Sequence, residues 1–258
     1  FNLFGFNFRD GVKYRQVSDL TWNNLGAGTN FVLVPAGSAG LIDGGVSFSN
    51  YRIEMREGAL PARSSEISGF NGGLNFKYFI RDDEIKYGIE LLGFRTDFSF
   101  FNSNGLNIGQ TQNTSELAAY VNYKKKVGKF IIDPGLRVQY YASLSVINLE
   151  PRMGLKWNIT DDLRFKAAAG MYSQNLVAAN SDRDVVNLFY GFLSSPENLS
   201  DTFTEEDGST REIKDPLQRA NHYVAGFEVD ITPELTANIE GYLKDFRQVT
   251  NLNRNKLF

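Results

Sequence analysis

The sequence contains no cysteine and only one histidine among its 258 residues. The absence of cysteine excludes disulfide bonds, thiolate zinc sites, iron–sulfur clusters and a cysteine nucleophile. Acidic and basic residues nearly balance, with a net charge of −3, so there is no basic surplus to bind nucleic acid. No run approaches the roughly 18 consecutive apolar residues that a membrane helix needs.

Aromatic residues and glycine are abundant instead, with 21 Phe, 12 Tyr, 2 Trp and 24 Gly. So many aromatic side chains argue against disorder. Mean hydropathy is nevertheless only −0.30, so the chain is polar on average despite its many aromatic residues.

Apolar and polar residues alternate with a period of two, which is typical of β-strands with one apolar face. Between Phe70 and Ile80, for example, every second residue is apolar or glycine. No window of comparable length favours a helix. The alternation predicts about ten strands, at 1–9, 12–21, 67–80, 84–101, 113–126, 129–144, 147–159, 163–176, 219–231 and 235–250.

The connections between these segments differ in length. Short turns are expected at Asp10-Gly11, 81–84, 126–129, 160–162 and 232–234, where turn-forming residues separate the strands. The alternate connections are longer and polar, and they are expected at 22–66, 102–112, 145–148 and 177–218, with a local hairpin within 30–57. Short turns at one end and long loops at the other predict an antiparallel up-and-down meander. No composition break marks a second domain, so 1–258 is expected to be a single region.

Alternation alone does not say whether the apolar face meets a protein core or lipid. A soluble β-sandwich, perhaps carbohydrate-binding, has the same pattern. Three features favour a transmembrane β-barrel: segments of roughly 12–18 residues against the usual ~5–6, charges along the whole polar face, and aromatic residues near the short turns. The aromatic residues are Tyr78, Tyr87, Phe130, Trp157 and Phe165.

One hairpin carries a family resemblance. Between Leu149 and Asn175 the sequence reads LEPRMGLKWNITDDLRFKAAAGMYSQN. It resembles the PR-x-G-x-x-(W/Y)-x-(I/L)-T-D-x-L hairpin and the following Y-x-Q of TonB-dependent outer-membrane receptors, particularly those of Bacteroidota. The matching residues are Pro151, Arg152, Gly154, Trp157, Thr160, Asp161, Leu163, Tyr172 and Gln174. Segments 71–91 and 225–246 look like further hairpins of the same kind.

The resemblance implies a cell outer-membrane location and a role as barrel wall in an active nutrient transporter. It also implies contact with outer-membrane lipid, coupling to the TonB energy system through a plug segment, and a surface lipoprotein as a further partner. A plug is not recognisable in this sequence, and receptors of the family have about twice as many strands. We therefore expect 1–258 to be an internal barrel portion of a longer receptor. A non-transport barrel, such as an adhesin or a structural protein, remains the alternative.

The sequence offers no convincing enzymatic or metal-binding motif. His222 has no accompanying G-x-S-x-G elbow, so it is interpreted as a polar residue at a strand start. The acidic stretch 201–208 fails the EF-hand spacing, and Gly26-x-Gly28 lacks the remainder of a nucleotide-binding motif. We expect no catalytic residue, no metal and no cofactor.

Substrate contacts are expected where charged and aromatic residues meet in polar connections. Within 177–218, charged residues stand beside aromatic ones, which suits stacking and hydrogen bonding to a sugar or a peptide. Trp22, at the start of the other long connection, is a weaker candidate. The expected substrate contacts are Trp22, Asp182, Arg183, Asp184, Tyr190 and Phe192.

Overall fold

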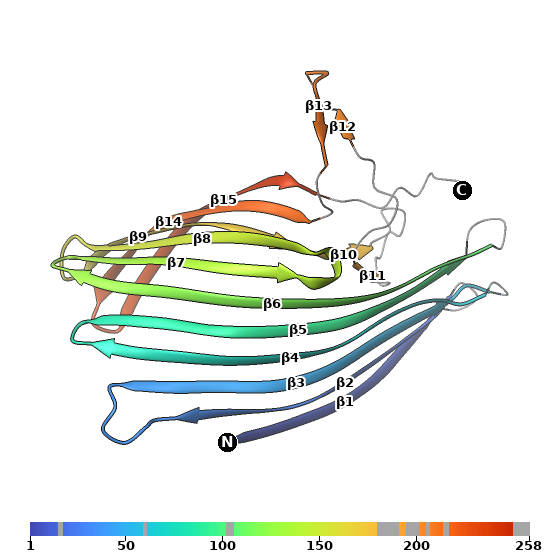
Figure 1. Ribbon diagram of the computed structural model, residues 1–258, viewed down its shortest axis with the longest axis horizontal. Helices are drawn as coiled ribbons and strands as arrows, with labels where there is room; N and C mark the ends of the chain where they lie inside the picture. Colours follow the sequence, from blue (N-terminus) through green and yellow to red (C-terminus); the bar gives the residue numbers. More distant parts are fainter. Residues whose placement is uncertain are drawn as a thin grey trace.

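The computed structural model of the protein describes residues 1–14, 18–58, 61–101, 106–179, 191–194, 202–204, 207–213 and 217–249. Within this part of the chain the dominant feature is one antiparallel sheet of eleven strands, in the order β1-β2-β3-β4-β5-β6-β7-β8-β9-β14-β15. Strands that follow one another in the chain pair up to β9, and β9 then pairs with β14, so the large sheet is the expected meander with one longer connection. Figure 1 shows it curved into an open wall, with β1 and β15 at its two free edges.

The strands of the wall are long, as the extended alternation predicts. Their bounds are β1 Asn2–Tyr14, β2 Ser18–Leu33, β3 Gly40–Arg56, β4 Arg63–Ile80, β5 Asp83–Phe101, β6 Asn107–Val127, β7 Phe130–Tyr141, β8 Val146–Asn158, β9 Leu163–Gln174, β14 Gln218–Thr232 and β15 Leu235–Gln248. The short strands β10 Leu176–Ala179, β11 Gly191–Ser194, β12 Thr202–Thr204 and β13 Thr210–Glu212 form two further small hairpins.

Helical structure in the described residues is limited to one 3-10 turn, η1, at Ala142–Leu144. None of the helices found there has the length and apolarity needed to cross a membrane.

The two ends of the wall differ. At one end, here the turn end, the strands are joined through 34–39, 81–82, 128–129, 159–162 and 233–234. At the opposite end, here the far end, the connections are 15–17, 57–62, 102–106, 142–145 and 175–217. Only the last of these is long. The remaining asymmetry lies in the strands themselves, because β2 to β6 extend well beyond β7 and β8 at the far end (Figure 1).

The expectation of a long connection over 22–66 is wrong, since β2, β3 and the start of β4 occupy it. Its glycines suggest a loop, but they make room for aromatic rings from neighbouring strands. A Cβ on Gly28 would lie 2.6 Å from the Phe4 ring, and one on Gly44 would lie 2.9 Å from the Phe31 ring. Glycine here permits close cross-strand packing rather than a turn. The additional strand raises the count from about ten to eleven.

The expected turn at Asp10-Gly11 is also wrong. Asp10 pairs with Trp22 and Gly11 with Thr21 inside a continuous β1–β2 ladder. Gly11 has little room for a side chain, because a Cβ there would lie 3.0 Å from the carbonyl oxygen of Leu20. The glycine therefore marks a close approach of two backbones within a strand, which sequence composition alone does not distinguish from a hairpin turn.

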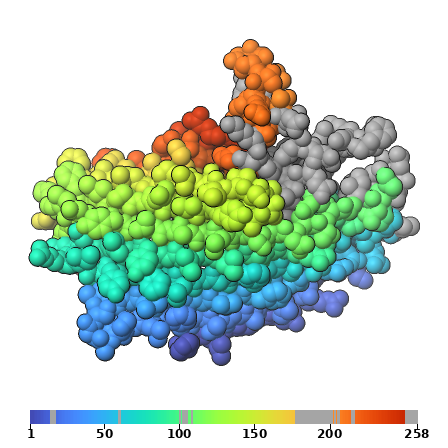
Figure 2. All heavy atoms as spheres, in the orientation of Figure 1, coloured from blue at the N-terminus to red at the C-terminus, as the bar shows by residue number. Residues whose placement is uncertain are grey.

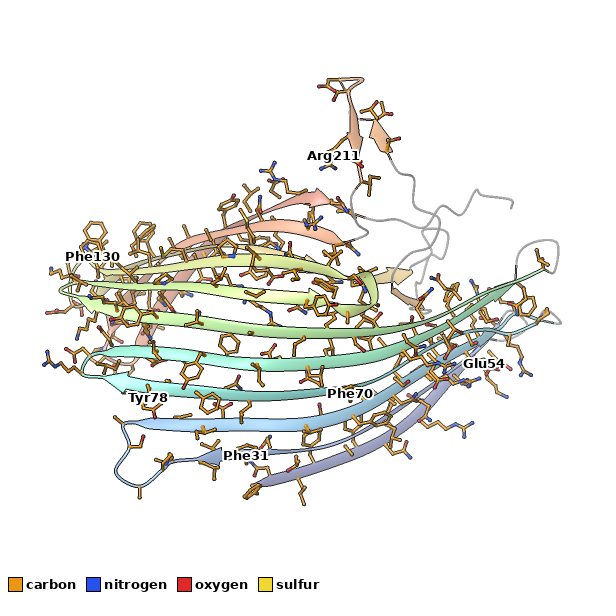
Figure 3. The ribbon with its side chains drawn as sticks, in the orientation of Figure 1. Phe31, Glu54, Phe70, Tyr78, Phe130 and Arg211 are labelled. Atoms are coloured by element: carbon orange, nitrogen blue, oxygen red, sulfur yellow. The ribbon has the colours of Figure 1, made fainter. Side chains whose placement is uncertain are left out.

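From the turn end to the middle of the wall, one face carries an apolar band. Large apolar side chains remain exposed there, among them Ile89 at 54% and Phe227 at 51%. Aromatic rings collect on this face toward the turn end, where Phe130 stacks on Trp157 at 5.7 Å between centroids and Phe76 on Tyr87 at 5.0 Å. Figure 3 places Tyr78 and Phe130 at that end and Glu54 at the opposite one. The arrangement agrees with the predicted aromatic girdle.

The other face is polar, and it is concave. Its charged residues line a cavity that is bounded by strands from β3 across to β9, which is possible only on the inside of the curve. No second large sheet covers the apolar face among the described residues, so they do not form the two-sheet sandwich considered above.

The polarity of the two faces reverses toward the far end. On β3, Phe48 points outward, whereas Tyr51 and Ile53 point inward. The strand pairing continues through this point without a register shift, so the exchange comes from the sequence and not from a bulge. We call the part of the wall beyond this reversal the collar.

The collar has a small apolar cluster inside and ion pairs outside. Leu20 and Ile53 are 2% and 1% exposed, and Trp22, Tyr51, Met55 and Phe98 pack around them. On its outer surface Arg52 pairs with Glu66 at 3.3 Å, and Arg95 with Asp97 at 2.8 Å. An ion-paired outer surface is suited to water. The collar therefore has charged residues outside and apolar residues inside, the reverse of the arrangement nearer the turn end.

The two small hairpins leave the wall in different directions. β11 lies against β4, β5 and β6, so the β10–β11 hairpin reaches from the end of β9 across the concave side. The β12–β13 hairpin, which carries Arg211, projects away from the wall (Figures 2 and 3). At its tip, the amide and the hydroxyl of Ser209 donate to Asp207 Oδ1 at 2.9 and 2.6 Å. These bonds lower the pKa of Asp207.

Candidate functional site

A cavity of about 590 Å³ lies on the concave face, toward the far end of the wall. Its two sides differ in chemistry. The side formed by β3, β4 and β5 is uncharged, with Ser47, Ser49, Ile67, Leu92 and Phe94 among its residues. The side formed by β6 to β9 carries the charged residues Glu116, Arg137, Glu150 and Arg152. A ligand in this cavity would therefore meet an uncharged wall and a charged one.

Glu150 is the most highly bonded residue of the charged side. It is 3% exposed, and its Oε1 accepts hydrogen bonds from the amide of Ser173 at 2.8 Å and from the Ser173 hydroxyl at 2.7 Å. Arg152 donates to Oε2 at 2.8 Å. Tyr141 completes the group through a 2.8 Å bond to the Ser173 hydroxyl. Through these bonds the Glu150 carboxylate fixes the last residues of β9, immediately before the long connection to β14 begins.

Arg152 is held from a second direction by aromatic rings. Its guanidinium lies 4.6 Å from the centroid of the Tyr172 ring, a cation–π geometry. Tyr172 in turn stacks on His222 at 4.5 Å. The only histidine of the sequence therefore supports an aromatic stack, which agrees with its interpretation as a structural polar residue.

Arg137 and Glu116 form the remaining part of the charged side. Arg137 pairs with Glu90 at 2.7 Å and donates through Nε to Gln139 at 2.9 Å. Gln139 links Arg137 to Glu116, because its Nε2 donates to Glu116 Oε2 at 2.8 Å. A smaller cavity of about 170 Å³ adjoins this group and is also lined by Arg137 and Arg152.

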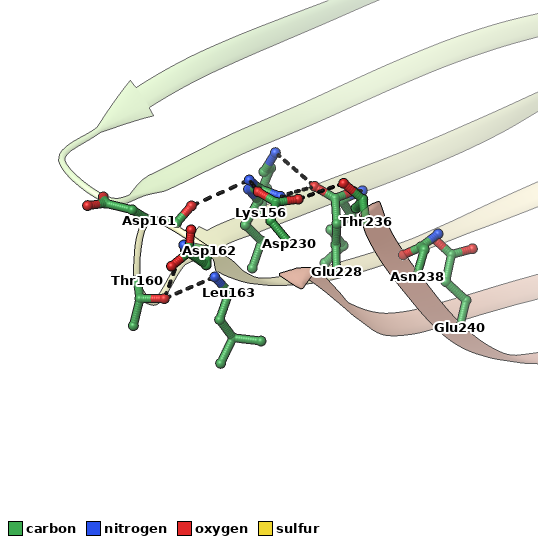
Figure 4. Close-up of polar contacts among 12 residues, drawn as sticks. Lys156, Thr160, Asp161, Asp162, Leu163, Glu228, Asp230, Thr236, Asn238 and Glu240 are labelled. Carbon is green, nitrogen blue, oxygen red and sulfur yellow. Dashed lines mark hydrogen bonds and ion pairs between the residues drawn. The ribbon is translucent and has the colours of Figure 1, made fainter. Parts of the chain in front are cut away.

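A second charged cluster lies on the concave face at the turn end (Figure 4). Arg164 binds Glu228 at 2.8 Å and also pairs with Asp230, and Lys166 pairs with Glu228. Thr236 donates to Asp230 at 2.8 Å. Each charge in this cluster has a partner of the opposite sign, so the cluster cross-links β9, β14 and β15.

The neighbouring turn is closed by Thr160. Its hydroxyl oxygen accepts from the amide of Leu163 at 2.9 Å and from that of Asp162 at 3.3 Å.

In the part of the chain that the structure describes, no group of three or more histidine, aspartate or glutamate residues is placed to hold a metal ion.

Comparison with known proteins relates this wall to solved structures. The outer membrane transporter YddB from Escherichia coli matches with a TM-score of 0.63 at 11% identity, over 95% of this chain and 37% of YddB. The ferric enterobactin receptor PfeA from Pseudomonas aeruginosa matches with a TM-score of 0.59 at 10% identity, over 89% of this chain and 35% of PfeA. The structure of the RagAB peptide transporter gives 0.54 and 12%, over 88% and 30%.

These proteins are TonB-dependent outer-membrane receptors or transporters. The chain has the fold of their barrel wall. The fold implied by the hairpin at Leu149–Asn175 is therefore confirmed, and the chain spans about a third of the length of each of these structures. No protein-family model and no curated protein matches the sequence.

Of the substrate contacts predicted from sequence, only Trp22 and Phe192 fall among the residues that the structure describes. Trp22 lies on the concave face of β2 but packs against Leu20 and Ile53 in the collar, so its ring has a structural partner. Phe192 lies in β11, paired with Ala178. Asp182, Arg183, Asp184 and Tyr190 lie outside the described residues.

The residues that line the barrel cavity were not singled out by sequence reasoning as a site. Arg137, Glu150 and Arg152 stand on the polar side of alternating strands, where they read as ordinary lumen charges. The missing signal is their register, since Arg137 is the cross-strand partner of Glu150. Charged residues at matching heights on adjacent strands would have indicated a cluster.

Proposed function

We propose that the chain forms part of the barrel wall of a TonB-dependent transporter in the outer membrane, which takes up a nutrient through its lumen. The observation that carries the proposal is the open antiparallel sheet, with its outward apolar band and charged concave face, which shares its fold with solved outer-membrane transporters over 88 to 95% of its length. Closing this sheet takes additional strands at β1 and β15, and a plug would occupy the concave side.

The cavity beneath the far end is the proposed substrate site. The far end corresponds to the extracellular side, because the Tyr-x-Gln sequence at Tyr172 and Gln174 leads into an extracellular loop in the receptors that it resembles. Arg152 and Arg137 are held in fixed geometry by carboxylates and aromatic rings. Preorganised polar side chains of this kind orient a ligand at low entropic cost. No residue is assigned a catalytic role.

The proposal is tested in cells that depend on the parent protein for growth on a limiting nutrient. Arg152→Ala should reduce uptake at low nutrient concentration, whereas Glu54→Gln, an outward collar residue, should leave it unchanged. Deletion of TonB should abolish uptake through the wild-type protein. Uptake that persists without TonB would contradict active transport, and a parent protein found outside the outer-membrane fraction would contradict the location.

A further inference from the structure

Glu116 differs from the other carboxylates around the cavity in having no ion-pair partner. Glu90 pairs with Arg137, and Glu150 pairs with Arg152. Glu116 is only 8% exposed, and among the described residues the single hydrogen bond to its side chain comes from the neutral amide of Gln139. That bond uses Oε2 and leaves Oε1 without a donor.

A buried carboxylate with one neutral donor is under-bonded. A carboxylate can accept about four hydrogen bonds, and burying its charge is costly unless it is paired and hydrogen-bonded. The nearest cation along the network, Arg137, already donates to Glu90 and to Gln139. Among the described residues the wall therefore places no cation in ion-pair contact with Glu116, although this residue lines the cavity.

The surroundings of Glu116 are apolar on one side. Its cross-strand partner on β5 is Leu92, which places two side chains next to each other on the same face of the sheet, about 5 Å apart. Phe94 and Ile67 continue this uncharged surface along the cavity. The site thus combines a negatively charged hydrogen-bond acceptor, the Glu116 carboxylate, with an adjoining apolar surface.

We infer that Glu116 binds a primary ammonium group of the transported ligand, and that an apolar part of the ligand packs against Leu92 and Phe94. The ammonium supplies donors that the wall does not, and its charge balances that of the carboxylate. Ligands with this chemistry are peptides with an apolar N-terminal residue and simple alkyl or aryl amines. The inference builds on the proposed role of the cavity as the substrate site.

The test measures binding to the purified parent protein in detergent, so that it does not depend on transport. The probes are phenylalanyl-glycine, its N-acetylated form and phenethylamine. The wild-type protein should bind at least one of the free amines about tenfold or more tightly than the N-acetylated peptide, as expected for a hydrogen bond to a charged group. Binding of the dipeptide alone points to peptides, and binding of phenethylamine points to simple amines.

Glu116→Gln keeps the shape of the side chain and should abolish the preference for free amines. Glu116→Asp keeps the charge and should retain the preference with weaker binding, which separates loss of charge from a folding defect. Glu54→Gln is the matched control on the outer surface of the collar and should behave as wild type. The inference is overturned if the N-acetylated peptide binds equally well, if Glu116→Gln retains the preference, or if no probe binds saturably. Loss of TonB-dependent uptake with intact amine binding would refute only the transport proposal.

Discussion

Ile89→Arg tests whether the outward face of the wall meets lipid. Ile89 lies on β5 and is 54% exposed. The outward residues of β5 are apolar or glycine from Ile85 to Gly93, and the next outward residue is Arg95. Eight residue steps of about 3.4 Å cover roughly 27 Å along the strand. At the usual tilt of about 40° this is about 21 Å across the membrane, close to the apolar band of about 25 Å in outer-membrane barrels.

Ile89 stands midway along this stretch, so an arginine there would lie near the bilayer midplane. The expected cost is about 2–4 kcal/mol in the free energy of unfolding. If the same face met water, substitution of a half-exposed residue would change stability by no more than about 0.5 kcal/mol. The two environments therefore predict clearly different results for one substitution.

The measurement is reversible unfolding of the protein in lipid vesicles, followed by the fluorescence of its tryptophans. Arg95→Leu is the matched control on the same face of the same strand, beyond the band, and should change stability by less than about 1 kcal/mol. A cost below about 0.5 kcal/mol for Ile89→Arg, or equal costs for the two variants, would refute the assignment of the apolar face to lipid.

Three further predictions concern packing, the cavity and pH. Gly28→Ala should destabilise the wall by about 1–3 kcal/mol, because a Cβ there would lie 2.7 Å from the Val46 carbonyl oxygen; Gly72→Ala, with its nearest atom at 3.8 Å, should be near neutral in the same unfolding assay. Glu150→Ala should cost about 1–3 kcal/mol, because the Arg152 side chain left behind is partly exposed, and should accelerate hydrogen exchange at the Ser173 amide; unchanged exchange would contradict the bond between Glu150 and that amide. Asp83, the first residue of β5, has a pKa lowered by bonds from the Tyr123 hydroxyl and the Lys126 amide. Its stabilisation should be fully present above about pH 4 and be lost as pH falls through the lowered pKa, and Asp83→Asn should remove that pH dependence from the unfolding midpoint.

Much of the wall could be predicted from the sequence, because alternation in a single phase reports a strand directly. Phe70 to Ile80 is such a case, and the structure places it in β4. Prediction failed in β2 and β3. Glycines such as Gly28 make room there for aromatic rings of neighbouring strands, and the apolar side chains of β3 change from the outer to the inner face between Phe48 and Tyr51. A phase change breaks the alternation into pieces that are too short to be recognised as one strand.

The cavity was harder to predict, because it depends on which residues of distant strands stand at the same height. Glu116 and Gln139 are 23 positions apart in sequence, and their contact requires the β6–β7 register. A residue such as Glu116 also differs from the neighbouring cavity carboxylates Glu90 and Glu150 by lacking an ion-pair partner. That property exists in three dimensions and has no counterpart in composition or spacing.

The reversal of polarity at the collar fixes how deeply the wall sits in its bilayer. Sliding the wall along the barrel axis toward its turn end would carry the Arg52–Glu66 and Arg95–Asp97 pairs on the outer surface into hydrocarbon, where each charge is costly. Sliding it toward its far end would bring the apolar band into water. Because the same change of phase recurs on β2 to β5, a force along the barrel axis meets resistance from several strands at once. In the proposed barrel the collar would therefore hold the wall at a fixed depth in the bilayer while a segment inside the lumen is pulled.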